Sequence, residues 1–272
     1  MTLQATVGPL TGPKQVGLIG GMVHAQVLVA FTSNVPKVGG QKMTMNDHYY
    51  ADPRSLGSRL RRRRFQHVRG LIKTIFDQKG GCRVLDLGGT VAYWTPFAPD
   101  LSDYNVEITV VNLDCDECHS SNIRVLTGDA RSLDFADASF DLIHSNSVIE
   151  HVGSWRDMRD MAREVRRLAP YYFVQVPYFW FFVEPHFRLP FFHWLPEPVR
   201  AHILTCTGAG FFPKAESMDQ AMSFVQHAQL LNHAQMEALF PDARIAHERI
   251  CGVTKSLMAI RDPGRPSYQL QV

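Results

Sequence analysis

The sequence lacks the features that mark several specialised classes of protein. Its 28 basic and 26 acidic residues leave a net charge of only +2, so no global field attracts nucleic acid or an anionic membrane. Its five cysteines are odd in number and scattered, which argues against a disulfide framework and is typical of reduced thiols in a cytoplasmic protein. With 45% hydrophobic and 20% charged residues, the composition is that of a globular protein with one full-sized core.

The sequence also lacks a hydrophobic run long enough to cross a membrane. The nearest candidate, residues 16–31, is interrupted by glycine, histidine and glutamine and falls short of the roughly 18–20 apolar residues that a span needs. We therefore expect no stable membrane insertion. Residues 1–42 show no helix or strand pattern, and we predict that they form a poorly ordered extension before a single domain at residues 43–272.

Metal-binding patterns are scarce. Residues 115–119 (CDECH) have a C-x2-C spacing, but a structural zinc site needs four ligands and no second pair is near. Glu150 and His151 offer two ligand types, yet a single carboxylate at this point favours a cap on the strand-to-helix turn. We therefore expect no metal.

From residue 49 onward, the pattern alternates between helices and strands. Residues 49–77 have apolar side chains at helical spacing, and we expect Arg61 to Arg64 to face mostly outward. A second helix is predicted from Ser154, a candidate N-cap, to Leu168. Near-continuous apolar strands are predicted at residues 83–88, 106–114, 122–129, 140–146 and 171–177.

Apolar strands separated by helices are typical of a parallel sheet that is covered on both faces. A last helix is predicted near residues 234–240, and segments 243–250 and 255–261 are close enough to pair as antiparallel neighbours. The predicted fold class is therefore α/β, with a doubly wound, mostly parallel, seven-stranded sheet.

In such a sheet, a ligand binds beyond the carboxyl ends of the strands. The first strand ends in Asp86, Gly88 and Gly89: the glycines let backbone N–H groups approach a ligand, and Asp86 can accept hydrogen bonds from the loop. Asp114 ends the second strand, where a carboxylate can accept both hydroxyls of a ribose. Asp129 follows the third strand and can accept from an adenine amine. Together these strand ends predict a pocket for adenosine.

In this order, the motifs resemble those of class I S-adenosylmethionine-dependent methyltransferases of the methyltransferase-11, small-molecule type. The resemblance covers residues 48–261 and is carried by VLDLGGT (84–90), VNLD (111–114), residues 127–152 and residues 239–261. It implies a Rossmann-like methyltransferase fold, an enzyme, and S-adenosylmethionine as cofactor. It implies that Gly88 and Gly89 contact the methionine moiety of the cofactor, that Asp114 binds the ribose, and that Asp129 and Ala130 contact the adenine. It also implies that the transferable methyl group lies beside Ser145 and Asn146.

One departure from the family pattern lies in the glycine loop. The family motif is close to G-x-G-x-G, whereas residues 88–92 read GGTVA, so the loop is bulkier. A Rossmann dehydrogenase fits less well, because it needs three spaced glycines and a helix N-terminus open to a pyrophosphate.

A dense aromatic segment follows the fifth strand and is broken by prolines that preclude a long helix. Core packing beneath a long loop is one interpretation of this segment. The other is an acceptor pocket with a lid at about residues 178–225, in which a flat or lipophilic acceptor binds to Trp180, Glu184, Arg188 and Trp194.

A base is optional for methyl transfer, because positioning alone supplies much of the rate. If the acceptor carries a hydroxyl, a histidine suits removal of its proton. We rank His186 first and His193 second, with His144 at the fourth strand end as a further candidate. A structural role is the alternative for each of the three.

Three functions remain open from the sequence. The first is methyl transfer from S-adenosylmethionine to an oxygen or nitrogen of a small, aromatic or lipophilic molecule. The second is a nucleic-acid methyltransferase using Arg61 to Arg64 on phosphates, which the near-zero net charge disfavours, so we expect no nucleic-acid partner. The third is a non-catalytic cofactor-binding protein. The oligomeric state, including a homo-oligomer, is left open.

Overall fold

The computed structural model describes residues 37–38, 41–42, 55–115, 118–119 and 122–264. Most of the predicted N-terminal extension, including residues 16–31, therefore lies outside the described residues. Within it, strands β1 (Lys37–Val38) and β2 (Gln41–Lys42) pair antiparallel. In the described part of the chain, no helix has the length and apolar character of a membrane span.

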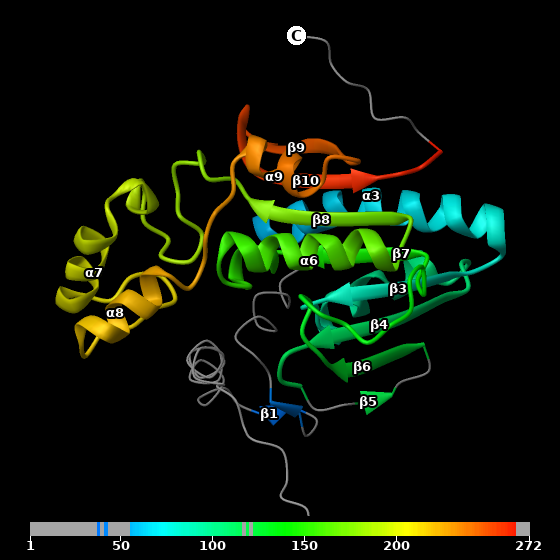
Figure 1. The fold of residues 1–272 in the computed structure, drawn as a ribbon, viewed down its shortest axis with the longest axis horizontal. Coiled ribbons are helices and arrows are strands. Elements are labelled where there is room, and N and C mark those ends of the chain that lie inside the picture. The colour runs from blue at the N-terminus through cyan, green and yellow to red at the C-terminus, as the bar shows by residue number, and fades with distance from the viewer. Residues whose placement is uncertain (1–36, 39–40, 43–54, 116–117, 120–121, 265–272) are drawn as a thin grey trace, which may run out of the picture.

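A single eight-stranded sheet forms the centre of the protein (Figure 1), in the order β5-β6-β4-β3-β7-β8-β10-β9. The bounds of its strands are β3 Cys82–Leu87, β4 Val106–Asn112, β5 Cys118–His119, β6 Ile123–Thr127, β7 Leu142–Asn146, β8 Tyr171–Pro177, β9 Arg244–Ile250 and β10 Val253–Arg261.

Five neighbouring strands of this sheet run parallel: β6, β4, β3, β7 and β8. Strand β10 runs antiparallel to both β8 and β9. The prediction of a mostly parallel sheet with a reversed last strand is confirmed, and the structure adds the two-residue edge strand β5. Strand order reverses beside β3, because β4 lies on one side of it and β7 on the other, which is where such sheets bind ligands.

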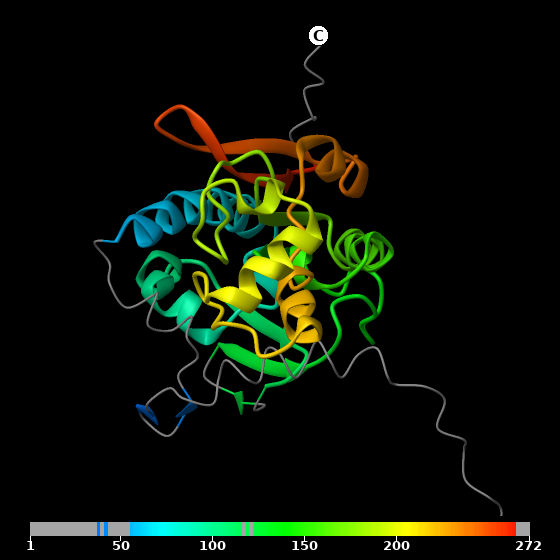
Figure 2. The same cartoon turned by 90° about the vertical axis from the view of Figure 1, so that its left-hand side faces the viewer.

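Helices cover both faces of the sheet, as Figures 1 and 2 show. One apolar core joins the sheet to helix α6 and a second joins it to helix α3. The helical elements are α3 Leu56–Lys79, α4 Val91–Trp94, η1 Thr95–Phe97, α5 Ala98–Leu101, η2 Ile149–His151, α6 Trp155–Leu168, η3 Phe192–Trp194, α7 Glu197–Cys206, α8 Met218–Val225 and α9 His233–Leu239.

The predicted helix at residues 154–168 is confirmed as α6, together with its cap. The Ser154 side chain accepts from the N–H of Asp157, and the Asp157 side chain accepts from the N–H of Ser154. Met158, Met161 and Val165 form part of its buried stripe. The capping box thus satisfies two N–H groups that the helix itself leaves unpaired.

The prediction that Arg61 to Arg64 face mostly outward is wrong for the two end residues. Arg61 and Arg64 are only 6% and 8% exposed, and the Arg64 Nε lies 3.6 Å from Glu248 Oε1 on β9. The reason is helical spacing: Arg61 lies four residues before the buried Phe65, and Arg64 lies four residues before the buried Val68, so both share the buried face of α3.

Residues 178–225, which we predicted to form an acceptor pocket and call the acceptor segment, stand at the edge of the sheet toward which the parallel strands point (Figure 1). Figure 2 shows helices α7 and α8 of this segment in front of that edge. It has an apolar core of its own, which includes Phe187, Phe192, Leu204 and Phe212. Some aromatic residues of the segment therefore do pack as a core, as one of the two interpretations expected.

The α6 cap generates a stability prediction. Replacement of Ser154 by Ala removes the acceptor for the Asp157 N–H, so we expect the free energy of unfolding to fall by about 1 kcal/mol. Ser154→Thr keeps the hydroxyl and should stay close to wild type. Urea unfolding followed by circular dichroism measures both, and an equal loss in the two variants would show that packing rather than capping is at stake.

Candidate functional site

The glycine loop, residues 88–90, follows β3 and tolerates no side chain at its first two positions. Gly88 has a φ of 71°, and a Cβ there would lie 2.6 Å from the Val148 side chain. A Cβ on Gly89 would lie 1.7 Å from Asp86 Oδ2. The two glycines are therefore required by the chain itself, because Val148 and Asp86 close in on the backbone.

Asp86 is fully buried beneath this loop. Its carboxylate accepts from Trp94 Nε1 at 2.7 Å and pairs with His144 Nδ1 at 2.7 Å. We expected Asp86 to accept from the N–H groups of the loop; among the described residues, its hydrogen bonds come from these two side chains instead. Asp86 thus ties α4 to β7, and it supports the glycine loop from below.

Two further side chains hold the glycine loop in place. Asn112, the last residue of β4, donates from Nδ2 to the Gly89 carbonyl at 2.7 Å. Thr90 stands where the family pattern has its second glycine, and its hydroxyl accepts from the N–H of Tyr93 as the N-cap of α4. The bulkier loop is therefore compatible with an ordered helix start.

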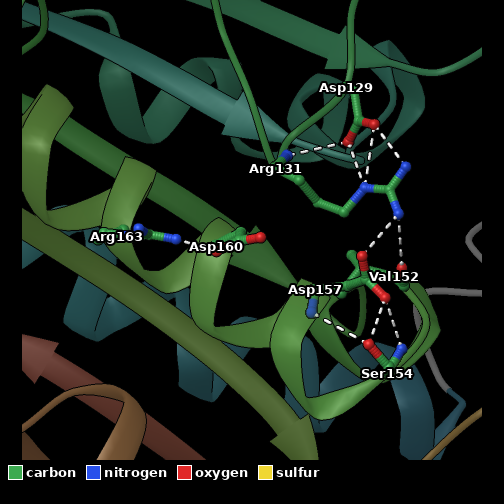
Figure 3. A network of polar contacts seen from close by, with 7 residues as sticks. All are labelled: Asp129, Arg131, Val152, Ser154, Asp157, Asp160 and Arg163. Atoms are coloured by element: carbon green, nitrogen blue, oxygen red, sulfur yellow. Dashed lines mark hydrogen bonds and ion pairs between the residues drawn. The ribbon is translucent and has the colours of Figure 1, made fainter.

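Asp114 lies two residues beyond β4 and is exposed, so its carboxylate is open to a ligand at this edge. Asp129 is differently placed, because Arg131 binds both its oxygens and also reaches Asp157 Oδ1 at 3.0 Å (Figure 3). Burial alone would raise the pKa of Asp129, but the Arg131 guanidinium lowers it below its ordinary value. Ala130 lies in the turn between Asp129 and Arg131.

Ser145 and Asn146 end β7 but differ in their surroundings. Ser145 is fully buried and donates to the Leu87 carbonyl at 3.3 Å, so it secures β7 against β3. The Asn146 Oδ1 is also buried, yet it has no hydrogen-bond partner among the residues that the structure describes. Asn146 is therefore the better placed of the two to accept from a ligand.

Beyond β7, one carboxylate and two imidazoles converge. Glu150 and His151 lie in η2, His186 comes from the acceptor segment, and one ligand atom of each lies within 4.8 Å of the others. We call these three residues the Glu–His cluster. It adjoins the glycine loop, because Val148, two residues before Glu150, is the side chain that packs against Gly88.

The Glu150 carboxylate is 1% exposed, and neither of its oxygens has a hydrogen-bond partner among the described residues. Burial raises the pKa of Glu150 to about 7, although its own N–H, the charge of His186 and the Ser147 hydroxyl, which all lie nearby, oppose this. The N–H and the hydroxyl belong to the strand-to-helix turn, so a capping role for Glu150 stays a prediction. A carboxylate without partners in the interior is costly unless a proton or a cation accompanies it.

His186 is held by a second carboxylate. Its Nδ1 pairs with Glu184 Oε1 at 2.7 Å, and the other oxygen of Glu184 accepts from the Phe187 N–H. Burial by itself lowers the pKa of His186, but the hydrogen bond to Glu184 and the charges of Glu184 and Glu150 raise it overall. Glu184, predicted to bind the acceptor, is 3% exposed and orients His186 instead.

The other two candidate bases are engaged within the protein. His144 is 1% exposed and sits between Asp86 and the Tyr93 hydroxyl, 3.1 Å from its Nε2. His193 donates from Nε2 to the Phe179 carbonyl at 2.7 Å, and burial lowers its pKa. We interpret both as structural residues, so the catalytic candidate that is left is His186, in the Glu–His cluster.

Three residues predicted to bind an acceptor lie at the surface of the acceptor segment. Trp180 and Trp194 are 56% and 41% exposed, with ring centroids 6.0 Å apart. Phe191 joins them, 50% exposed and 5.0 Å from Trp194. Arg188 lies over the Phe211 ring at 4.2 Å.

A hollow of about 330 Å³ lies at the opposite edge of the sheet, near the amino ends of β3 and β4. Three of its charged residues pair with one another, because Asp141 pairs with both Lys79 and Arg83. Ligands of open α/β sheets bind at the other edge, so we assign the hollow no role in cofactor binding.

Residues 84–170 match the sequence profile of a protein family described as a methyltransferase domain. The match extends from β3 to the residue before β8 and includes every predicted cofactor contact, and the strand order is that of the predicted fold. Residues 84–170 form a methyltransferase domain. The protein is an enzyme, and its cofactor is S-adenosylmethionine.

The methyltransferase is also similar to solved structures, whereas no curated protein sequence matches it. Magnesium protoporphyrin IX methyltransferase from Synechocystis PCC 6803, with bound SAH, shares 14% identity at a TM-score of 0.45, covering 88% of this chain and 99% of that one. A SAM-dependent methyltransferase from Methanosarcina mazei shares 14% identity at a TM-score of 0.40, covering 66% and 91%.

The residues at the carboxyl edge of the methyltransferase fit this cofactor. The glycine loop has no side chains at its first two positions, so a ligand can approach the backbone at the strand end. Asp114 is exposed, and its carboxylate can accept hydrogen bonds from a ribose. The buried Asn146 Oδ1 has no donor among the described residues, and an amine of the cofactor would supply one. Asp129 fits less directly, since its oxygens already bind Arg131. It would use a remaining lone pair toward adenine.

The sequence-based interpretation missed Asn112, Trp94 and Arg131. Asn112 ends a strand two residues before a predicted ligand contact, which is a signal that could have identified it. Arg131 stands two residues after Asp129, which it binds, so it also carried a local signal. Trp94 carries no such signal, because its bond to Asp86 comes from packing between elements.

The crowding at the glycine loop generates a matched pair of substitutions. Gly89→Ala places a Cβ against the Asp86 carboxylate, so we expect the free energy of unfolding to fall by about 1–3 kcal/mol. Gly70→Ala, in α3 with nothing within 4 Å, should instead stabilise the protein by up to about 1 kcal/mol. Urea unfolding measures the free energy of unfolding of both variants. Equal changes in the two would show that the Asp86 carboxylate does not crowd position 89.

Proposed function

We propose that this methyltransferase transfers the methyl group to an oxygen or nitrogen of a small, flat or lipophilic acceptor held against the acceptor segment. The observation that carries the proposal is the Glu–His cluster, which lies next to the glycine loop and joins η2 to the acceptor segment. It places proton-accepting groups at the boundary between the cofactor edge and the aromatic residues.

On the cofactor side, Asp114 accepts the ribose hydroxyls, Gly88 and Gly89 lie along the methionine moiety, and Asn146 accepts from its amine. The cofactor supplies a methyl group on a sulfonium, which needs a nucleophile in line and no acid to release the leaving group. The chain contributes chiefly by holding the two reactants together, an effect worth up to about 7–11 kcal/mol in favourable cases.

On the acceptor side, the Glu–His cluster faces the hydroxyl or amine and removes its proton. Glu184 holds the Nδ1 of His186, so the second nitrogen of that ring points away from the pair and toward the cluster. A buried carboxylate and a supported imidazole together suit a group that must gain and lose a proton near neutral pH.

The exposed rings of Trp180, Phe191 and Trp194 support an acceptor with a flat or lipophilic body, since large aromatic side chains bind such surfaces well. A nucleic-acid acceptor is less well supported. Two of the four arginines that would contact phosphates, Arg61 and Arg64, are buried in α3.

The cofactor side is tested through Asp114. Asp114→Ala removes the acceptor of two ribose hydroxyls, and we expect it to weaken S-adenosylmethionine binding by about 2–3 kcal/mol. Asp103→Ala is the matched control, because Asp103 is an exposed carboxylate at the opposite end of β4. Isothermal titration calorimetry measures the S-adenosylmethionine affinity of both variants. An unchanged affinity in a folded Asp114→Ala protein would show that Asp114 does not bind the cofactor.

The acceptor side is tested through His186. His186→Ala should lower turnover by about 10²- to 10⁴-fold and leave S-adenosylmethionine affinity nearly unchanged, because the cofactor is held at other strand ends. His202→Ala, an exposed histidine of α7, should keep full turnover. The assay follows a labelled methyl group into candidate phenols and amines. Full turnover in His186→Ala would leave positioning alone as the source of the rate.

A further inference from the structure

We propose that the Glu–His cluster binds a divalent transition-metal ion of the zinc type. One carboxylate and two imidazoles with an open fourth position form a ligand set that zinc uses in catalytic sites. The ligand atoms of Glu150, His151 and His186 lie within 4.8 Å of one another. Four-coordinate zinc needs ligand atoms about 3.3 Å apart, as follows from metal–ligand distances of about 2.0–2.1 Å, so small side-chain movements close the site.

Both imidazoles are oriented as metal ligands usually are. His151 Nδ1 lies 3.0 Å from the His227 carbonyl, which can only accept, so Nδ1 carries the proton and Nε2 presents the lone pair. His186 Nδ1 lies 2.7 Å from Glu184 Oε1, which makes the same assignment for the second ring. A carbonyl or carboxylate behind each ligating histidine fixes the tautomer and the ring orientation.

The carboxylate supplies the independent observation. Glu150 is 1% exposed, and no cationic side chain pairs with it among the described residues. Only its own N–H and the Ser147 hydroxyl, both neutral groups, lie close enough to lower its pKa as hydrogen-bond donors. Structural carboxylates in protein interiors are paired or hydrogen-bonded, so this one is poised for a cation that arrives from outside the chain. The cluster therefore has the carboxylate, the two imidazole nitrogens and the supporting groups that a metal site needs.

The ion's role, unlike its binding, rests on the proposed function. With the ion bound, the Nε2 of His186 is a ligand, so the cluster acts through the ion and no longer takes the proton itself. The fourth ligand position would take the acceptor's hydroxyl oxygen and favour loss of its proton to water. That oxygen then forms a bond to the methyl carbon as the carbon–sulfur bond breaks and its electron pair goes to sulfur. The ion itself is neither oxidised nor reduced.

Metal binding is tested on the full-length protein after dialysis against a chelator. Titration with Zn²⁺ by calorimetry, with metal content by mass spectrometry, should show one tightly bound ion per chain. Mg²⁺, which prefers octahedral oxygen ligands, should bind at least about 100-fold more weakly. The absence of a stoichiometric Zn²⁺ site would overturn the proposal.

Variants locate the site. Glu150→Gln and His186→Ala should each weaken Zn²⁺ binding by at least about 100-fold, and Glu184→Gln by about 10- to 100-fold, since it acts through His186. The control is His202→Ala. His202 lies 4.0 Å from Cys206 Sγ at the surface, where adventitious zinc would bind, and its loss should leave the tight site intact.

Two measurements keep the outcomes separable. Zn²⁺ should raise the melting temperature of wild type but not of Glu150→Gln, while both proteins bind S-adenosylmethionine equally. Tight Zn²⁺ binding that survives in Glu150→Gln would place the ion elsewhere and overturn the proposal. If Zn²⁺ binds as expected but no acceptor is methylated, the proposed function fails and the metal site stands.

Discussion

The buried carboxylate of Asp86 is the constraint on which the cofactor edge depends. A carboxylate in the interior needs donors, and here Trp94 and His144 supply them from α4 and β7. The bond from His144 holds β3 against β7, and the bond from Trp94 holds β3 against α4. They also explain the second glycine, because the space beside Gly89 is filled by Asp86 itself.

A second buried carboxylate, Glu150, differs from the first in having no partner among the described residues. Where Asp86 stabilises the fold, Glu150 costs stability, and burial raises its pKa to about 7. Such an exception to the pairing of buried charges is typical of functional sites rather than of structural ones. Asp86 thus belongs to the part of the carboxyl edge that supports the glycine loop, and Glu150 belongs to the part that we propose acts on the acceptor.

The fold divides the work between two regions with separate cores. The predicted cofactor contacts lie at the ends of β3, β4, β6 and β7, which the sheet holds together. The acceptor segment has its own apolar core and contributes His186 to the Glu–His cluster. Under the proposed function, changes in its exposed rings, such as Trp180 and Trp194, would alter the choice of acceptor without disturbing the predicted cofactor contacts.

Much of the fold follows from local signals. The apolar strands, the capped helix at Ser154 and the two glycines after β3 could be predicted because periodicity, caps and turn chemistry act within a few residues. The placement of Asp114 at an open strand end follows in the same way. Other features depend on tertiary contacts: Arg61 and Arg64 are buried because helix α3 turns that face toward the sheet and β9.

Ser145 and Asn146 also show what the sequence could not predict. They are neighbours at the end of β7, yet Ser145 is buried against β3, whereas the Asn146 Oδ1 has no partner among the described residues. The Glu–His cluster required the full fold, because Glu150 and His186 come from different segments and only packing of the acceptor segment against η2 brings them together. Sequence patterns by themselves therefore determined the sheet, its helices and the cofactor edge, through interactions between near neighbours. Tertiary structure decided which polar side chains are buried and which of these are hydrogen-bonded or ion-paired, because burial depends on how the whole chain packs.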